Sequence, residues 1–181
     1  MPYQPQRVNG RDVGQADRDC GSRYEAIRDH LRAHHPHGPV HVLDLGAYAG
    51  YFAVRLVEDF DAHVVAVDDH PPLRQVASDR ITVINHRLDA DQIDGLGDFD
   101  AVLLLSVLHH TPDWPRILEV VCRRSTLLYL ETPDPSEHLP RAAAHTSELA
   151  AAAECLGGQV LARTAGYRST IPRKLRAICL R

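Results

Sequence analysis

Short apolar runs alternate with stretches of helical periodicity along this chain, and no other feature constrains its fold as strongly. The runs, which have the length and composition of buried strands, are Val40–Leu45, His63–Val67, Ile81–Asn85, Phe99–Leu105 and Leu127–Leu130. Patterns typical of helices separate most of them. Strands that alternate with helices predict an α/β fold, in which a mainly parallel sheet is doubly wound by helices on both faces.

The last part of the chain follows a different pattern. An alanine-rich helix is expected over Thr146–Leu156 and should end at the Gly157-Gly158 pair. Two strand-like stretches follow, Gln159–Arg163 and Leu175–Leu180, with no helical pattern between them. Neighbouring strands without a crossover connection must be antiparallel. We therefore expect a seven-stranded, mainly parallel sheet that ends in an antiparallel hairpin.

Length, charge and cysteine spacing exclude several classes of protein. The 181 residues suit one domain, and 20 Lys and Arg against 24 Asp and Glu give a net charge of −4, so no global positive field attracts nucleic acid or an anionic membrane. The four cysteines form no C-x-x-C pair, which argues against a zinc module or a disulfide framework. No apolar run has the length of a membrane span, so we expect a cytoplasmic protein without membrane or nucleic-acid partners.

Polar side chains and glycines follow the predicted strands at their carboxyl ends. The segment Asp44–Gly50 follows the first strand, Asp68-Asp69 the second, Leu88-Asp89 the third, and Ser106 through His109-His110 the fourth. In open α/β sheets ligands bind beyond the carboxyl ends of the strands, near the point where the strand order reverses. These four segments are therefore expected to meet in one crevice.

The same four segments carry a family resemblance. The sequence VLDLGAYAGYF over residues 42–52 resembles the first motif of the class I S-adenosylmethionine-dependent methyltransferases, and VAVD over residues 65–68 resembles their ribose-binding motif. Leu88-Asp89-Ala90 is similar to the acidic adenine-contacting motif, and Phe99 through His110 to the motif on the fourth strand and the loop after it. The resemblance extends over about Val40 to Arg181. It implies the class I methyltransferase fold, with S-adenosylmethionine as cofactor and S-adenosylhomocysteine as product.

The resemblance also implies a set of cofactor-binding residues. They are Asp44, Gly46, Ala47, Tyr48, Gly50, Asp68, Asp69, Leu88, Asp89 and Ser106. Asp44 and the two glycines should border the methionine part, Asp68 the ribose, and Leu88 with Asp89 the adenine.

One position departs from the family pattern. Tyr48 stands where the family has its middle glycine, and a tyrosine takes positive φ only at a cost. We therefore expect either a different backbone at this position or a Tyr48 side chain on the rim of the pocket. A nicotinamide-binding fingerprint would require glycine at Tyr48 and at Tyr51, and both are absent.

The acceptor side is specified less sharply. A neutral imidazole suits the deprotonation of an alcohol, so His109 or His110 is the predicted catalytic base, and the residues alone do not choose between them. The expected acceptor contacts are Arg23, Tyr24, Glu131 and Arg168. Residues 1–39 are expected to form an arm and a helix over Ser22–Ala33, N-capped by Ser22, that act as a lid or cap on the acceptor side. Residues 40–181 should form the S-adenosylmethionine-binding catalytic domain.

The predicted reaction is O-methylation of a small polar acceptor, such as a natural product, a sugar, or a group bearing phosphate or carboxylate. One alternative is an RNA-end or tRNA methyltransferase, whose metal-assisted form would use Glu131, Glu137 and His138 as ligands. Another is a non-catalytic subunit that binds S-adenosylmethionine. No metal site is assigned.

Overall fold

Seven strands in the described part of the chain form one twisted sheet. The computed structural model describes residues 2–35, 37–139 and 142–181, so Met1 and Pro36 of the expected arm and helix end, and Pro140 and Arg141, lie outside the described residues. The strands are β3 (His41–Leu45), β4 (His63–Val67), β5 (Ile81–Ile84), β6 (Phe99–Leu105), β7 (Ser125–Glu131), β8 (Gln159–Ala165) and β9 (Pro172–Cys179), and their order in the sheet is β5-β4-β3-β6-β7-β9-β8.

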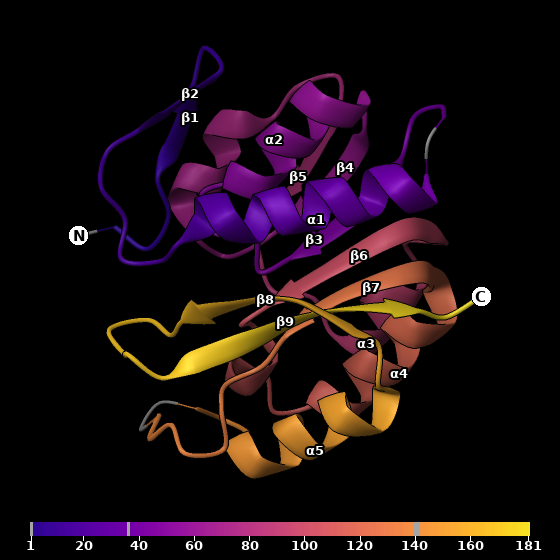
Figure 1. The fold of residues 1–181 in the computed structure, drawn as a ribbon. Coiled ribbons are helices and arrows are strands. Elements are labelled where there is room, and N and C mark those ends of the chain that lie inside the picture. The colour runs from indigo at the N-terminus through magenta and orange to yellow at the C-terminus, as the bar shows by residue number, and fades with distance from the viewer. Residues whose placement is uncertain (1, 36, 140–141) are drawn as a thin grey trace.

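Helices cover both faces of this sheet, as Figure 1 shows. The helices α1 (Cys20–His34) and α2 (Tyr51–Phe60), with the 3₁₀ helix η1 (Pro71–Val76), lie on one face. The helices α3 (Ala90–Asp94), α4 (Trp114–Arg124) and α5 (Thr146–Leu156) lie on the other, and the 3₁₀ helix η2 (Leu108–His110) follows β6. Each face has its own apolar core, because side chains of the buried strands point alternately to the two sides. The predicted doubly wound α/β fold is confirmed.

The strand order reverses between β3 and β6. Strand β3 pairs in parallel with β4 on one side and with β6 on the other, so a crevice opens between their carboxyl ends. Strand β9 is antiparallel to both β7 and β8 and lies between them. The antiparallel hairpin at the end of the sheet is therefore confirmed, and its second strand is an interior strand.

The N-terminal residues contain a hairpin that we did not expect from the sequence. Strands β1 (Gln6–Val8) and β2 (Arg11–Val13) pair around Asn9 and Gly10, whose φ angles are 48° and 73°. Asn-Gly is the usual signal of such a turn, so the expectation of an irregular arm was wrong over this segment. Arg7 holds the hairpin against α2 by donating a 2.8 Å hydrogen bond to Glu58.

The helix that follows the hairpin starts earlier than predicted. It begins at Cys20, and its N-cap is Asp19, whose carboxylate accepts a 3.0 Å hydrogen bond from the Ser22 backbone N–H. The prediction of Ser22 as the N-cap was therefore wrong, because Asp19 supplies the acceptor that this helix end requires.

No helix among the described residues has both the length and the apolar character needed to cross a membrane.

Candidate active site

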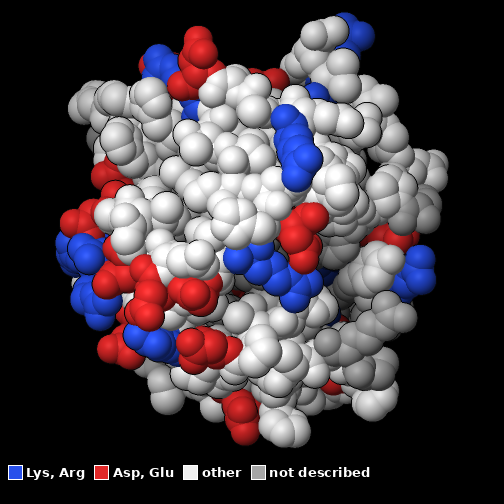
Figure 2. Space-filling view, turned by 180° about the vertical axis from the view of Figure 1, so that it is seen from behind, with Lys and Arg blue, Asp and Glu red and all other residues white. Residues whose placement is uncertain are grey.

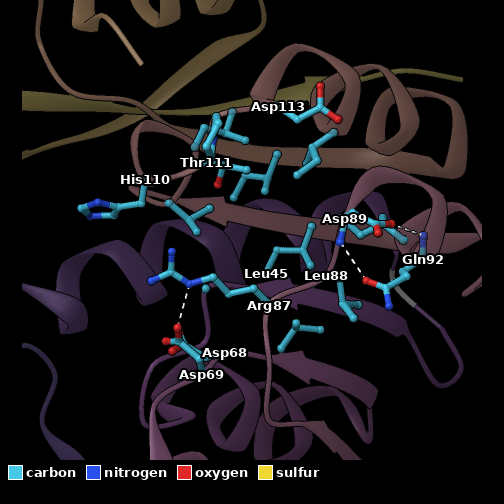
Figure 3. A pocket seen from close by; sticks show the side chains of 18 residues that line it. Leu45, Asp68, Asp69, Arg87, Leu88, Asp89, Gln92, His110, Thr111 and Asp113 are labelled. Atoms are coloured by element: carbon cyan, nitrogen blue, oxygen red, sulfur yellow. Dashed lines mark hydrogen bonds and ion pairs between the residues drawn. The ribbon is translucent and has the colours of Figure 1, made fainter. Parts of the chain in front are cut away.

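A cavity of about 580 Å³ opens at the carboxyl ends of β3, β4 and β6, where the strand order reverses. Figure 3 shows Asp68 and Asp69 on one side of it, His110 and Thr111 across from them, and Asp89 with Gln92 farther along. The residues that line the cavity include Gly46, Asp68, Asp69, Arg87, Leu88, Asp89, Gln92, Val107 and His110.

Two glycines shape the turn between β3 and α2. Gly46 and Gly50 both have a φ of 81°, which favours glycine. A Cβ at Gly46 would lie 2.7 Å from Val107 Cγ2, and a Cβ at Gly50 would lie 2.6 Å from Val76 Cγ2. Glycine at these two positions therefore allows the side chains of Val107 and Val76 to pack directly against the backbone of the turn.

Tyr48 has a left-handed backbone, with a φ of 54°, in the region that favours glycine. The Tyr48 N–H donates a 2.9 Å hydrogen bond to Asp68 Oδ2, and the ring stacks on His70 at a centroid distance of 4.0 Å. These contacts hold a conformation that costs a tyrosine about 1 kcal/mol or more.

Asp44, at the carboxyl end of β3, is the buried acid of the site. Its side chain is buried, and its Oδ2 has no hydrogen-bond partner in the part of the chain that the structure describes. Burial, and secondarily the nearby Asp68, raises the pKa of Asp44 to about 7. A buried carboxylate oxygen without a partner is costly, so this position favours a ligand that brings a donor or a positive charge.

Three more acidic residues line the wall of the cavity after β4 and β5. Asp68 Oδ1 accepts a 2.8 Å hydrogen bond from the His70 N–H, and Asp69 pairs with Arg87 at 2.7 Å. Asp89 is the N-cap of α3: its carboxylate accepts a 2.8 Å hydrogen bond from the Gln92 N–H in a capping box. Asp68 retains lone pairs for a ligand, because each carboxylate oxygen accepts more than one hydrogen bond.

The two histidines after β6 have different environments. His109 is buried with no hydrogen-bond partner for its Nδ1 among residues 2–35, 37–139 and 142–181, and burial, followed by His110 and Arg173, lowers its pKa to about 3. His110 is exposed and lines the cavity, and its pKa is lowered by partial burial and then by Arg87 and Arg173. His110 therefore has access to a ligand while its imidazole is kept neutral.

Glu131, at the end of β7, is the centre of a buried ion network. It pairs with Arg18 at 2.6 Å and with Arg23 at 2.9 Å, and it accepts hydrogen bonds from the hydroxyls of Ser106 and Thr164. Burial acts to raise the pKa of Glu131, but Arg23 and Arg18 outweigh it and hold that pKa below its ordinary value. The network joins α1 and the segment before it to the sheet.

Arg173 extends the network from β9. Its guanidinium donates to both carboxylate oxygens of Glu137 at 2.8 Å and to Ser106 Oγ at 3.0 Å. Glu131 and Glu137 are thus occupied by arginines, and His138 is exposed. Within residues 2–35, 37–139 and 142–181, no three His, Cys, Asp or Glu side chains form a group that could hold a metal ion.

The structure brings most of the predicted cofactor residues together. Gly46, Asp68, Asp69, Leu88 and Asp89 line the cavity, while Asp44, Ala47, Tyr48 and Gly50 belong to the β3 end and the turn beside it. Ser106 instead has its hydroxyl bonded to Glu131, at a φ of 59°.

Three of the four predicted acceptor contacts lie inside the protein, where Arg23 and Glu131 pair with each other. Arg23, Tyr24 and Glu131 are all fully buried, and the Tyr24 hydroxyl donates to Arg55 O at 2.7 Å, so none of the three presents a free surface to an acceptor. Arg168 is exposed, and its Nε lies 3.8 Å from Asp17 Oδ2.

Several residues of the site were not identified from the sequence. Arg87 and Gln92 line the cavity, and the position of Arg87 directly before Leu88 and Asp89 was a usable signal. Val107 was signalled only by lying beside Ser106. Arg18 had no signal, because its partner Glu131 is 113 residues away in the chain.

The residues present fit S-adenosylmethionine. The unpartnered Asp44 Oδ2 can accept from the ammonium of its methionine part, and Gly46 of the turn after β3 lines the cavity without a side chain. Asp68 directly follows β4, a position at which a carboxylate can bind ribose hydroxyls.

Comparisons with known proteins agree with this geometry. Residues 16–165 match the model of a family described as "Methyltransferase domain". A search of curated proteins finds no match. Among solved structures, the bifunctional kinase-methyltransferase WbdD superposes with a TM-score of 0.71 at 23% identity, over 91% of this chain and 40% of that chain. The chain thus spans about two fifths of the length of WbdD.

Two further structures contain bound S-adenosylhomocysteine (SAH). The N-terminal domain of EvdMO1 has a TM-score of 0.68 at 18% identity, over 99% of this chain and 92% of that one. The magnesium protoporphyrin IX methyltransferase (ChlM) from Synechocystis PCC 6803 has a TM-score of 0.63 at 16% identity, over 86% and 81%. The chain belongs to the methyltransferase-domain family and has the class I fold of S-adenosylmethionine-dependent methyltransferases.

Proposed function

We propose that this domain transfers a methyl group from S-adenosylmethionine to an oxygen atom of a small polar acceptor. The observation that carries the proposal is that the carboxyl end of β3 holds the buried carboxylate of Asp44, with one oxygen unpartnered among the described residues, while the imidazole of His110, after β6, lines the cavity. The first suits the cationic methionine part of the donor, and the second suits an acceptor that must lose a proton.

On this proposal each side of the cavity holds one part of the donor. Asp44 accepts from the ammonium, Asp68 binds the ribose hydroxyls, and Leu88 packs against the adenine. Arg87, held by Asp69, closes the same wall. When bound, S-adenosylmethionine supplies an electrophilic methyl group on a sulfonium, whose departure leaves SAH.

We assign the role of base to His110. A base whose pKa is about 3, as at His109, takes little of a hydroxyl proton near neutral pH, and His109 is also buried. His110 reaches the cavity, so its imidazole can accept the acceptor's proton as the oxygen forms its bond to the methyl carbon. The buried His109 then positions η2, whose backbone carbonyl at His109 accepts a 2.7 Å hydrogen bond from the Ala143 N–H.

The surface supports a small acceptor better than a polymer. On the face shown in Figure 2, Lys and Arg side chains lie beside Asp and Glu side chains, and no extended basic area is present on that face. Nucleic-acid binding draws most of its affinity from such areas. We extend the proposal to the N-terminal residues before β3, whose buried Gln4 and Arg18 make them a cap on the acceptor side.

Thermal unfolding tests donor binding. We expect SAH and S-adenosylmethionine, and not NAD, to raise the melting temperature by several degrees at about a hundred times the dissociation constant, where binding adds roughly 2.7 kcal/mol. Asp68→Ala should weaken SAH binding about 10- to 100-fold, because hydrogen bonds to a charged acceptor are worth about 1.5–3 kcal/mol. Unchanged SAH affinity in Asp68→Ala would contradict the ribose assignment.

Turnover measured with an identified acceptor distinguishes the roles of His109 and His110. His110→Ala should lower kcat about 10²- to 10⁴-fold and leave SAH affinity near that of the unaltered protein. His110→Gln serves as the control for shape, since it retains polarity without a base. A kcat that survives His110→Ala and is lost in His109→Ala would reverse the assignment.

A further inference from the structure

Three tyrosines from distant parts of the chain meet beside the donor turn. Tyr3 of the N-terminal segment lies 5.5 Å, between ring centroids, from Tyr48 and 5.5 Å from Tyr167, with interplanar angles of 57° and 52°. Tyr167 belongs to the connection between β8 and β9. We call Tyr3, Tyr48 and Tyr167 the tyrosine cluster.

The cluster adjoins the donor site. Tyr48 lies in the turn between Gly46 and Gly50, and its N–H is bonded to Asp68, the proposed ribose ligand. Its backbone is strained at a φ of 54° in a turn where glycine would be free of that cost. Strain at such a position indicates that the side chain itself is used.

The cluster is accessible and has polar groups at its edge. Tyr167 is 38% exposed, and the guanidinium of Arg168 lies 5.1 Å over its ring. Arg168 also has a left-handed backbone, with a φ of 50°. Asp17 Oδ2, 3.8 Å from Arg168 Nε, is buried and has no hydrogen-bond partner among the described residues. The edge of the cluster thus carries the ion pair of Arg168 with Asp17.

We propose that the tyrosine cluster binds a saccharide ring of the acceptor, and that Arg168 and Asp17 bind its hydroxyl groups. A sugar ring is puckered and has apolar C–H faces as well as hydroxyls at its edge. Rings inclined at more than 50° to each other form a corner that suits such a body, whereas a flat aromatic acceptor is best held between parallel faces. Mixed aromatic and hydrogen-bonding groups match the two kinds of surface that a sugar presents.

This inference rests on the proposed function, because it names the acceptor of the same site. Its test measures ligand binding in the full chain saturated with SAH. Saturation-transfer difference NMR would be recorded with the methyl α-pyranosides of glucose, mannose and galactose, and separately with catechol as a flat aromatic probe. The variants are Tyr167→Ala, the conservative Tyr167→Phe, and Val13→Ala, which alters another exposed apolar side chain, on β2.

We expect ring C–H signals from at least one pyranoside, about fivefold weaker binding in Tyr167→Ala, and near-normal binding in Tyr167→Phe and Val13→Ala. No signal from any pyranoside, or binding that is unchanged in Tyr167→Ala, overturns the inference, as does binding of catechol alone. SAH binding, followed separately by thermal unfolding, distinguishes an error in the acceptor class from an error in the proposed function. If SAH binds and the sugars do not, only the acceptor class is wrong, whereas failure of SAH to bind rejects the proposed function itself.

Discussion

The two halves of the crevice solve the problem of buried polar groups in opposite ways. At the carboxyl end of β3, next to the cavity-lining Leu45, Asp44 keeps an oxygen that is unpartnered among the described residues. On the side of β7 and β9, Glu131 pairs with Arg18 and Arg23, and Glu137 pairs with Arg173. In the first half a buried carboxylate is left for a ligand to pair with, and in the second half the buried carboxylates have arginine partners. Loss of a residue should therefore reduce ligand binding in the first half and stability in the second.

The largest effect should come from Glu131 in the complete half. Glu131→Gln removes the charge that Arg18 and Arg23 share in a fully buried position, and we expect a loss of about 3–5 kcal/mol of unfolding free energy. Chemical denaturation measures this loss. Arg116→Ala, which removes an exposed pair with Asp91, is the matched control and should cost less than about 1 kcal/mol. Equal losses in the two variants would show that the buried network is not what stabilises this half.

A smaller effect on stability, joined to a loss of binding, should come from Gly46 in the open half. Gly46→Ala places a Cβ 2.7 Å from Val107 at a φ of 81°, and we expect a loss of about 1–3 kcal/mol together with weaker SAH binding. Denaturation and calorimetric titration measure the two quantities. In Tyr48→Gly, relief of strain offsets the lost ring contact and the added freedom of the unfolded chain, so its stability should change by less than about 1 kcal/mol. A large destabilisation in Tyr48→Gly would show that the ring holds the turn.

The smallest effect should be the pH dependence that Asp44 imposes. Its folded pKa of about 7 lies above its ordinary value of 3.8, so its contribution to stability is fully present below about pH 3.8 and is lost as the pH rises through 7. A cationic ligand group reverses this preference. SAH affinity should therefore rise by up to about tenfold per pH unit below 7 and level off above it. Titration of Asp44→Asn should give a flatter profile, and an unchanged slope would assign the dependence to another group.

Local pattern accounts for what the sequence predicted correctly. The bounds of β4, β6 and α5 match the predicted runs, because buried strands and an amphipathic helix show their own periodicity. Asp44 and Asp68 could be selected as candidates because each lies at the carboxyl end of a predicted strand: Asp44 is the residue before the last of β3, and Asp68 directly follows β4.

Long-range pairing accounts for what was missed. Arg18 and Glu131 have ordinary neighbours in the sequence, and only the packing of α1 against the end of the sheet brings them into contact. Arg23 and Tyr24 were expected at the acceptor because the resembled fold commonly turns its N-terminal helix toward the acceptor side; the structure buries both side chains. The exposure of a polar side chain depends on its partner, which one sequence does not show.

The insertion of β9 between β7 and β8 also has a consequence for the order of assembly during synthesis. The partner that β8 needs is made after it, so β8 stays unpaired and β7 keeps an open edge until Pro172–Cys179 has been translated. Arg173, which holds Ser106 and Glu137, arrives with that same strand. A nascent chain therefore completes this side of the sheet only after β9 has been made, and until then the edge of β7 is the surface that a chaperone must shield from aggregation.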